Sequence, residues 1–220
     1  MSGSKRRSSD RGDKKSPRDI FVRFPEIVDD RIDTFEFLTA SRGVVKLIDK
    51  FGKLFSPVKY DMQGNIEKLS ARYLTDKEVN ATLQDMLLLE IAIGETVTCT
   101  DALVWLTRGL HMIQSFFEKI VVDYKSGEGT EDLAAVLKKA YAESLEPYHG
   151  WMAKQLFGLL SRMVPTRTHL LQALASEVSC KEETTVEALE EFTRGLKNNV
   201  TTLHAFYDEH RLDHKRYVAV

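Results

Sequence analysis

From about residue 28 onward, apolar residues recur at intervals of three and four positions. This spacing is typical of helices that turn one face toward a core. No segment alternates apolar and polar residues between hairpin turns, and no repeat period stands out. The pattern predicts an all-α chain of about eight helices, forming a single domain over residues 20–220.

Turn and cap residues predict where these helices begin and end. The run Ser41-Arg42-Gly43 indicates a break in the first helical region, and Pro57 suits the first turn of a new helix. Thr75-Asp76-Lys77-Glu78 has the spacing of a capping box, and Thr100 is placed to cap a long apolar helix. Pro147 is expected to open a later helix.

Two predicted helical stretches are apolar around more of their circumference than one core-facing stripe requires. They are residues 79–93 and 100–120. Two layers of helices around a middle layer would explain this excess, and so would an apolar cavity that accepts hydrocarbon chains. The pattern alone leaves both explanations open.

The composition indicates a folded protein without a general attraction to nucleic acid. Of 220 residues, 43% are hydrophobic and 29% are charged, and the net charge is −2. Cys99 and Cys180 stand apart, which favours a reducing compartment. No apolar run is long enough to span a membrane, and the first residues lack the apolar core of a signal peptide. We expect a soluble, cytosolic protein.

Residues 1–19 are polar and basic, and they contain almost no apolar side chain. Such a segment cannot offset the entropy lost on ordering, so it is expected to be a disordered tail. An inert leader is one interpretation, and a weak attraction to anionic lipid is another. The basic residues of the tail are Lys5, Arg6, Arg7, Arg11, Lys14, Lys15 and Arg18.

Motifs of catalysis are missing from the sequence. It has no nucleophile elbow, no zinc-protease motif, no phosphate-binding loop and no dinucleotide fingerprint. His210 and His214 have the spacing of two metal ligands on a helix, but no further ligand cluster completes a site. We therefore expect no enzyme, no cofactor and no metal.

One polar strip suggests ligand chemistry. On a helix, Asp61, Asn65 and Lys68 project from the same face, because they are four and three positions apart. A carboxylate, an amide and an ammonium together offer varied donors and acceptors, which suit a polyhydroxyl ligand. The alternative is an ordinary solvated helix face.

Two other places hold polar groups among apolar ones. Trp105 and Arg108 lie three positions apart in an apolar helix, and His149 lies between Tyr148 and Gly150-Trp151. Trp105 as a core filler, Arg108 as a buried ion and His149 as a hydrogen-bonded core histidine are the structural alternatives. The residues by themselves leave these alternatives open.

Taken together, the three places resemble the glycolipid transfer protein family over roughly residues 30–220. The resemblance implies a two-layer all-α sandwich that takes up one sphingolipid. The headgroup would lie in a polar surface site, and the ceramide chains in an apolar pocket. The matching motifs are Asp61-x-x-Gly64-Asn65-Ile66-x-Lys68, Trp105-Leu106-x-Arg108-Gly109-Leu110 and Tyr148-His149-Gly150-Trp151.

The resemblance also assigns roles to individual residues. Asp61 is similar to the acid that accepts a hydrogen bond from the ceramide amide N–H, and His149 to the imidazole that donates to the amide oxygen. Asn65 and Lys68 resemble the residues that bind the first sugar's hydroxyls. Trp105 resembles the indole on which that sugar stacks.

Three further roles follow from the same resemblance. Arg108 has the position of a structural arginine that supports the carboxylate of the site. Trp151 resembles an aromatic residue of the membrane-docking surface. Tyr217 resembles a C-terminal tyrosine that helps to close the headgroup site, although this chain has one extra residue after the motif.

The family has a branch that binds ceramide-1-phosphate, which requires cationic residues where this chain has Asp101 and Trp105. A carboxylate there would repel a phosphate, so the glycosphingolipid branch is favoured. The expected function is a monomeric, non-catalytic carrier of glucosyl-, galactosyl- or lactosylceramide between membranes. A ceramide-1-phosphate carrier, a glycolipid sensor or adaptor without net transport, and a helical scaffold are the alternatives.

Overall fold

The computed structural model describes residues 21–94, 97–176 and 181–213. In these ranges the chain is helical, and β-bridges occur only as isolated pairs. The prediction of an all-α fold with about eight helices is confirmed. The α-helices of the described ranges are α1 (Thr34–Ile48), α2 (Ser56–Thr75), α3 (Leu83–Ile93), α4 (Thr98–Ser126), α5 (Leu133–Ser144), α6 (Trp151–Leu160), α7 (Arg167–Ser176) and α8 (Glu182–His210).

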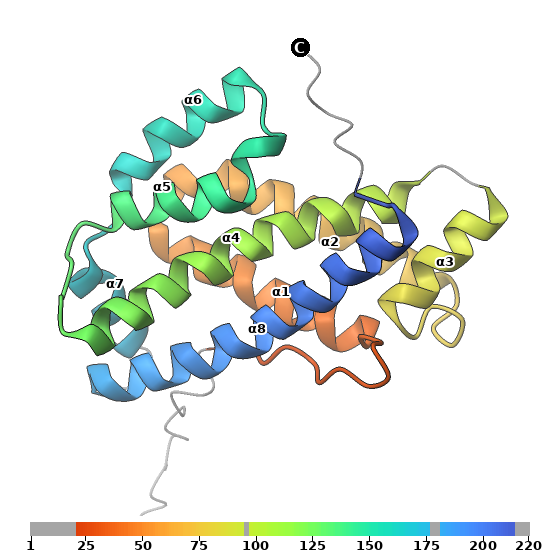
Figure 1. Cartoon of the computed structure of the whole chain (residues 1–220), viewed down its shortest axis with the longest axis horizontal. Coiled ribbons are helices and arrows are strands. Elements are labelled where there is room, and N and C mark those ends of the chain that lie inside the picture. Colours follow the sequence, from red (N-terminus) through yellow and green to blue (C-terminus); the bar gives the residue numbers. More distant parts are fainter. Residues whose placement is uncertain (1–20, 95–96, 177–180, 214–220) are drawn as a thin grey trace, which may run out of the picture.

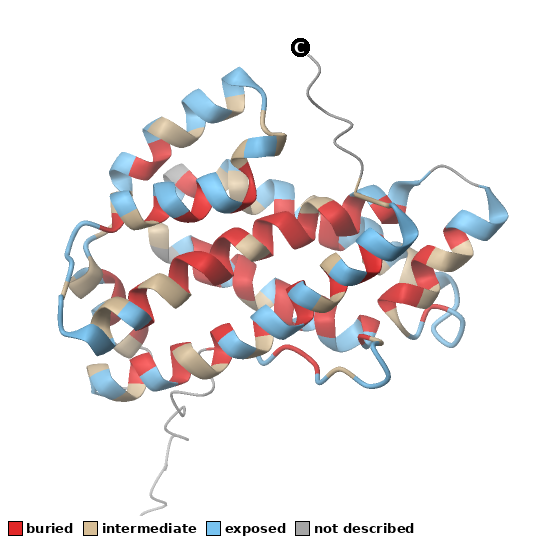
Figure 2. Cartoon of the chain, viewed as in Figure 1, coloured by how far each residue is buried: buried red, intermediate tan, exposed pale blue. Residues whose placement is uncertain are grey.

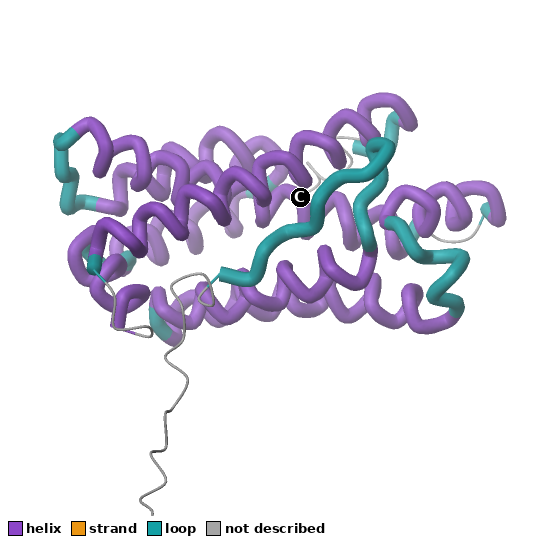
Figure 3. The backbone as a smooth tube through the Cα atoms, turned by 90° about the horizontal axis from the view of Figure 1, so that it is seen from below, coloured by secondary structure: helices purple, strands orange, loops and turns teal. Residues whose placement is uncertain are grey.

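Helix α4 is the centre of the fold. It packs against α2, α5 and α8, so most of its circumference is buried. Figures 1 and 3 show two layers, with α4, α5 and α8 in one and α1 and α2 in the other. This arrangement explains the excess of apolar residues over residues 100–120. Over residues 79–93, by contrast, Val79, Ile91 and Ile93 are exposed.

Residues 21–33 form an extended strap that crosses between α1 and α8 (Figure 3). Phe21 and Phe24 of the strap are buried against Phe192 of α8, with ring centroids 5.1 and 6.0 Å away. Gly43 of α1 lies beneath the strap, where a Cβ would come 2.9 Å from the Cγ2 of Val22. The predicted break at residues 41–43 is therefore wrong: the glycine admits the strap, and α1 continues to Ile48.

The predicted capping box at residues 75–78 is also wrong. Helix α2 runs through Thr75, and the carboxylate of Asp76 then accepts the backbone N–H groups of residues 78 and 79 to form a turn. The helix start lies later, where the Thr82 hydroxyl accepts the N–H of Asp85 and donates to its carboxylate. Both positions offer a capping residue, but only the second leads into α3.

The N-terminus of α4 is capped by a residue of another helix. Helix α4 begins at Thr98, ahead of the cap predicted at Thr100. The buried carboxylate of Glu90, from α3, accepts the N–H groups of Cys99 and Thr100 and the hydroxyl of Thr100. A negative group at this end of a helix is favourable. Glu90 thereby fixes the start of the helix that carries Trp105 and Arg108.

Helices α5 and α6 are joined by a short irregular link. Pro147 lies in a 3₁₀ turn, Glu146–Tyr148, and α6 begins only at Trp151. His149 has an extended backbone (φ −94°, ψ 132°) and lies in the link between the two helices. Helix α6 lies at the edge of the molecule, and most of its residues are exposed (Figures 1 and 2).

Candidate functional site

A pocket of about 500 Å³ opens between α2, α4, α5 and α6. Five of the six residues for which the sequence predicts ligand contacts line it, and the sixth, Tyr217, lies outside the described residues. Three come from α2, one from α4 and one from the link before α6, although these segments are far apart in the sequence. The predicted residues that line the pocket are Asp61, Asn65, Lys68, Trp105 and His149.

The polar strip of α2 forms one wall of the pocket. The carboxamide residue Asn65 is buried, whereas Asp61 and Lys68 are exposed at its sides. Lys68 has no ion-pair partner among the described residues, so its ammonium remains free for a ligand. The strip thus faces a concave site, which an ordinary solvated helix face does not.

The imidazole of His149 is held by two aromatic residues. Its Nδ1 lies 3.0 Å from the hydroxyl of Tyr141, and its ring lies nearly parallel to that of Trp105, with centroids 5.9 Å apart. Tyr141 in turn stacks on Phe157 of α6, with centroids 3.6 Å apart. These contacts fix the imidazole at the wall of the pocket.

Enclosure by the pocket has opposite effects on Asp61, whose side chain still reaches solvent, and on the half-buried His149. It raises the pKa of Asp61, although His149 and Lys68 partly oppose this shift. It lowers the pKa of His149, although the nearby Asp61 opposes that shift. The ordinary pKa of histidine is 6.5, so His149 is mainly neutral at pH 7. In the tautomer in which Nδ1 accepts from the Tyr141 hydroxyl, the ring proton of neutral His149 lies on Nε2.

Arg108 lies behind the pocket wall. Its guanidinium is 3.6 Å from the ring centroid of Tyr148 and 4.6 Å from that of Trp105. The charge is buried, and it pairs with the carboxylate of Asp213, just after α8. The sequence predicted that Arg108 supports the carboxylate of the site, but among the described residues Arg108 pairs with Asp213 and forms no ion pair with Asp61.

The pocket continues from polar to apolar. Beyond the polar wall its lining includes Met112, Leu145, Phe157 and Leu160. Next to it lies an apolar cavity of about 20 Å³ between the two layers. The pocket and the cavity share lining residues, so they lie next to each other in the fold. The shared residues are Val58, Met112, Phe157 and Leu160.

The outer side of α6 is unusually apolar for a surface. Trp151 is 75% exposed and Met152 is 77% exposed, and Leu159 and Met163 are 60% exposed each. Leu156 is also exposed, and it lines the pocket as well. The apolar surface thus reaches the mouth of the pocket.

Some residues of the site left no signal in the sequence. Tyr141 and Asp213 belong to no motif, so nothing in the sequence pointed to them. Asp213 is also far along the chain from Arg108, the residue that it contacts. Tyr148 was part of a matching motif, but its contact with Arg108 needed the structure. Tyr217 lies outside the described residues. Asp101 is exposed one helical turn before Trp105.

Among the described residues, no three His, Cys, Asp or Glu side chains gather in an arrangement that could hold a metal ion. None of the helices described has the length and apolar character needed to cross a membrane.

Comparison with known proteins gives consistent results. A family model described as glycolipid transfer protein matches residues 32–176. The glycolipid transfer protein of Xenopus tropicalis is 32% identical over 188 residues, which cover 83% of this chain and 88% of that protein. Pleckstrin homology domain-containing family A member 8 of Mus musculus is 31% identical over 194 residues, which cover 84% of this chain. The match spans only 36% of that longer relative.

Solved structures have the same fold. The structure of FAPP2, described as selecting simple glycosphingolipids with this fold, has a TM-score of 0.77 at 28% identity; the match covers 94% of this chain and 98% of that one. HET-C2, a fungal glycolipid transfer protein, has a TM-score of 0.73 at 28% identity, with 88% and 95% covered. Mouse ceramide-1-phosphate transfer protein, at 20% identity with 89% and 97% covered, shares the fold with a TM-score of 0.78. From its sequence, its helical arrangement and these matches, the chain belongs to the glycolipid transfer protein family.

Proposed function

We propose that this protein is a non-catalytic carrier that binds one glycosphingolipid and moves it between membranes. The observation that carries the proposal is a single pocket that joins a polar wall to an apolar interior. A lipid with a sugar headgroup and two hydrocarbon chains needs both. The relationship to the Xenopus glycolipid transfer protein and to FAPP2 supports the same function.

The ceramide amide would lie between Asp61 and His149. Asp61 is an acceptor for the amide N–H, and the Nε2–H of neutral His149 is a donor for the amide oxygen. A diacylglycerol has no amide N–H, so it would leave the carboxylate without a partner. The clamp would thus select for a sphingoid backbone.

The sugar would occupy the remaining polar wall. The free ammonium of Lys68 and the carboxamide of Asn65 would bind its hydroxyls, and Trp105 would offer an apolar ring to its C–H face. Since Arg108 is paired with Asp213, Lys68 is the cation left for a ligand in this pocket. One cation in a pocket that also contains the carboxylate of Asp61 suits a neutral sugar better than a phosphate. We therefore place glucosyl-, galactosyl- and lactosylceramide ahead of ceramide-1-phosphate.

The hydrocarbon chains would enter between the layers. The apolar cavity holds about 20 Å³, roughly one water molecule, so core side chains must move apart to admit a chain. Each buried CH₂ is worth about 0.8 kcal/mol in the protein or in a bilayer. Extraction is therefore close to balanced in free energy, and the protein's contribution is to shield the chains as they cross water.

Uptake would take place where α6 meets a membrane surface. The exposed Trp151 and Met152 suit the headgroup layer, and Leu156 connects this surface to the pocket mouth. A monomer that docks, loads and leaves satisfies this geometry, and we place it in the cytosol with transient contact to membranes.

The test is a transfer assay between donor and acceptor vesicles of phosphatidylcholine. The donor carries fluorescent glucosylceramide, galactosylceramide, lactosylceramide or ceramide-1-phosphate. We expect faster transfer of the three glycolipids. A preference for ceramide-1-phosphate would assign the chain to the other branch. Binding of glycolipid vesicles without transfer would favour a sensor, and deletion of residues 1–19 would then show whether the tail governs recruitment.

A further inference from the structure

The buried Arg108 joins three parts of the chain that are distant in sequence. It stands on α4, and its guanidinium lies over the rings of Trp105 and Tyr148. Only 5% of the residue is exposed. Its charge is balanced by Asp213, whose side chain is also mostly buried, at 19% exposure. One cation therefore contacts the indole of the pocket, the residue next to His149 and the segment after α8.

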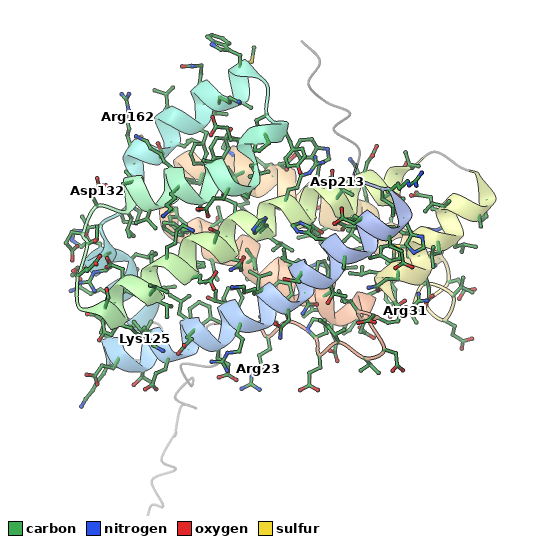
Figure 4. The ribbon with its side chains drawn as sticks, in the orientation of Figure 1. Arg23, Arg31, Lys125, Asp132, Arg162 and Asp213 are labelled. Carbon is green, nitrogen blue, oxygen red and sulfur yellow. The ribbon has the colours of Figure 1, made fainter. Side chains whose placement is uncertain are left out.

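The end of α8 is shaped to bring Asp213 to this position. Arg211 adopts the left-handed conformation (φ 55°, ψ 41°), which a residue with a Cβ rarely adopts, and the N–H of Leu212 bonds to the carbonyl of Tyr207. The buried hydroxyl of Tyr207 lies 2.8 Å from that of Thr107 on α4. Figure 4 shows Asp213 where α8 ends beside α4.

We propose that Asp213 is a positioning residue of the headgroup site. It holds Arg108 between the two aromatic rings, and so sets the indole of Trp105 and the link that carries His149. The inference rests on the proposed lipid-carrier function, and it adds the last described segment of the chain to the site. Asp213 does not line the pocket, so its effect passes through Arg108.

The physical reason is that Arg108 needs two kinds of partner at once. The ring contacts favour a flat cation, while a buried charge without a counter-ion is costly. If Asp213 lost its charge, the guanidinium would be drawn toward water and would leave the rings. Trp105 would then lose the group packed against it, and the link of His149 would lose its contact through Tyr148.

The substitution Asp213→Asn removes the charge with almost no change in shape. Asp213→Glu restores the charge, and Arg108→Lys keeps the charge but loses the flat surface that covers the rings. The control is Glu190→Gln, which breaks the exposed ion pair of Glu190 with Lys125. That pair also joins α4 to α8, but it lies at the other end of α8 from Asp213 (Lys125 is labelled in Figure 4).

Two measurements report on the state of the headgroup site. The first is the emission of Trp105 in protein without lipid, recorded in a Trp151→Phe background, where it is the only tryptophan of the chain. The second is glucosylceramide transfer in proteins that retain tryptophan at 151. For Asp213→Asn and Arg108→Lys we expect red-shifted emission, stronger quenching by acrylamide and a fall in transfer of about tenfold. Asp213→Glu should recover most of both signals, and Glu190→Gln should match the wild type.

Three results would overturn the proposal. One is wild-type emission and transfer in Asp213→Asn. Another is a lower unfolding temperature of Asp213→Asn with transfer unchanged, which would make the pair merely structural. The third is equal loss in Asp213→Glu and Asp213→Asn, which would show that the charge is irrelevant. If the wild type itself transfers no lipid, the proposed function fails, and the emission of Trp105 still decides the role of Asp213.

Discussion

Trp105 and His149 lie with their rings nearly parallel, inclined by 22°, and with centroids 5.9 Å apart. One comes from the central helix α4, and the other from the irregular link before α6. This contact joins the residue proposed to carry the sugar to the residue proposed to hold the ceramide amide. Changes in either residue should therefore affect both parts of the headgroup site.

Replacing Trp105 with Ala should reduce selection for the sugar more than it reduces lipid uptake. The sugar loses its apolar platform, worth about 1 kcal/mol, or roughly a fivefold change. Trp105→Phe should retain part of the selection for the sugar, because phenylalanine still offers an aromatic ring. The measurement is the ratio of glucosylceramide to unglycosylated ceramide extracted from vesicles. An unchanged ratio in Trp105→Ala would remove the indole from the headgroup site.

Replacing Asp61 with Asn should lower glucosylceramide transfer about tenfold or more, because a charge-assisted hydrogen bond to the ceramide amide is lost. The matched control is Glu67→Gln on the same helix, since Glu67 is exposed and does not line the pocket. Initial transfer rates between vesicles give the result. Equal rates for Asp61→Asn and the control would contradict the amide clamp.

Acidification should reduce the free energy of unfolding below about pH 6.5. Burial lowers the pKa values of His111, His149 and His204 below the ordinary value of 6.5. The unfolded chain then binds more protons as the pH falls, so stability is full above 6.5 and declines toward the folded-state values. Asp61 has a raised pKa, so just above its ordinary value of 3.8 the folded chain binds more protons than the unfolded chain. In that pH range Asp61 increases the free energy of unfolding as the pH falls.

The pair His111–His204 provides a test of this dependence. Their ring centroids are 5.3 Å apart. Burial is the largest cause that lowers the pKa of each histidine; His204 and Lys119 add to the shift of His111, and Arg108 adds to that of His204, while nearby acidic residues oppose both shifts. A variant with both histidines replaced by Gln should lose less stability between pH 7.5 and 5.5 than the wild type does. Unfolding midpoints at the two pH values measure this, and parallel losses in both proteins would refute it.

Replacing Glu90 with Gln should cost about 1–3 kcal/mol of unfolding free energy. A carboxamide has one acceptor oxygen where the carboxylate of Glu90 uses both, so a buried donor at the start of α4 loses its partner. Urea unfolding provides the value, with Glu187→Gln on the exposed side of α8 as the control. A cost similar to that of the control would mean that α4 does not depend on this cap.

Local patterns were enough to predict the helices and the polar strip. The three- and four-residue spacing of apolar side chains is itself the cause of helix burial, and Asp61, Asn65 and Lys68 share a face through helix geometry alone. The polar residues that complete the pocket were reached only through the resemblance to a family. Nothing in the chain around Trp105 indicates that it meets His149.

The errors came from contacts between distant segments. Gly43 was interpreted as a helix break, but it makes room for Val22 of the strap. Thr100 was interpreted as a cap, but its own N–H is bonded by Glu90 of the preceding helix. The partner of Arg108 was equally hidden, because Asp213 reaches it through the fold. Such pairs leave no trace in spacing, so only the structure reveals them.

The small volume of the apolar cavity between the layers has a consequence for the acyl-chain length of the lipid. A preformed tunnel would accept chains up to a fixed limit and reject longer ones abruptly. Here Phe51, Phe116 and Phe157 surround almost no empty volume, so each added carbon must displace packed side chains. Affinity for the lipid should therefore decline gradually as its acyl chain lengthens, because each added carbon displaces more of the core, and should not drop abruptly at one chain length.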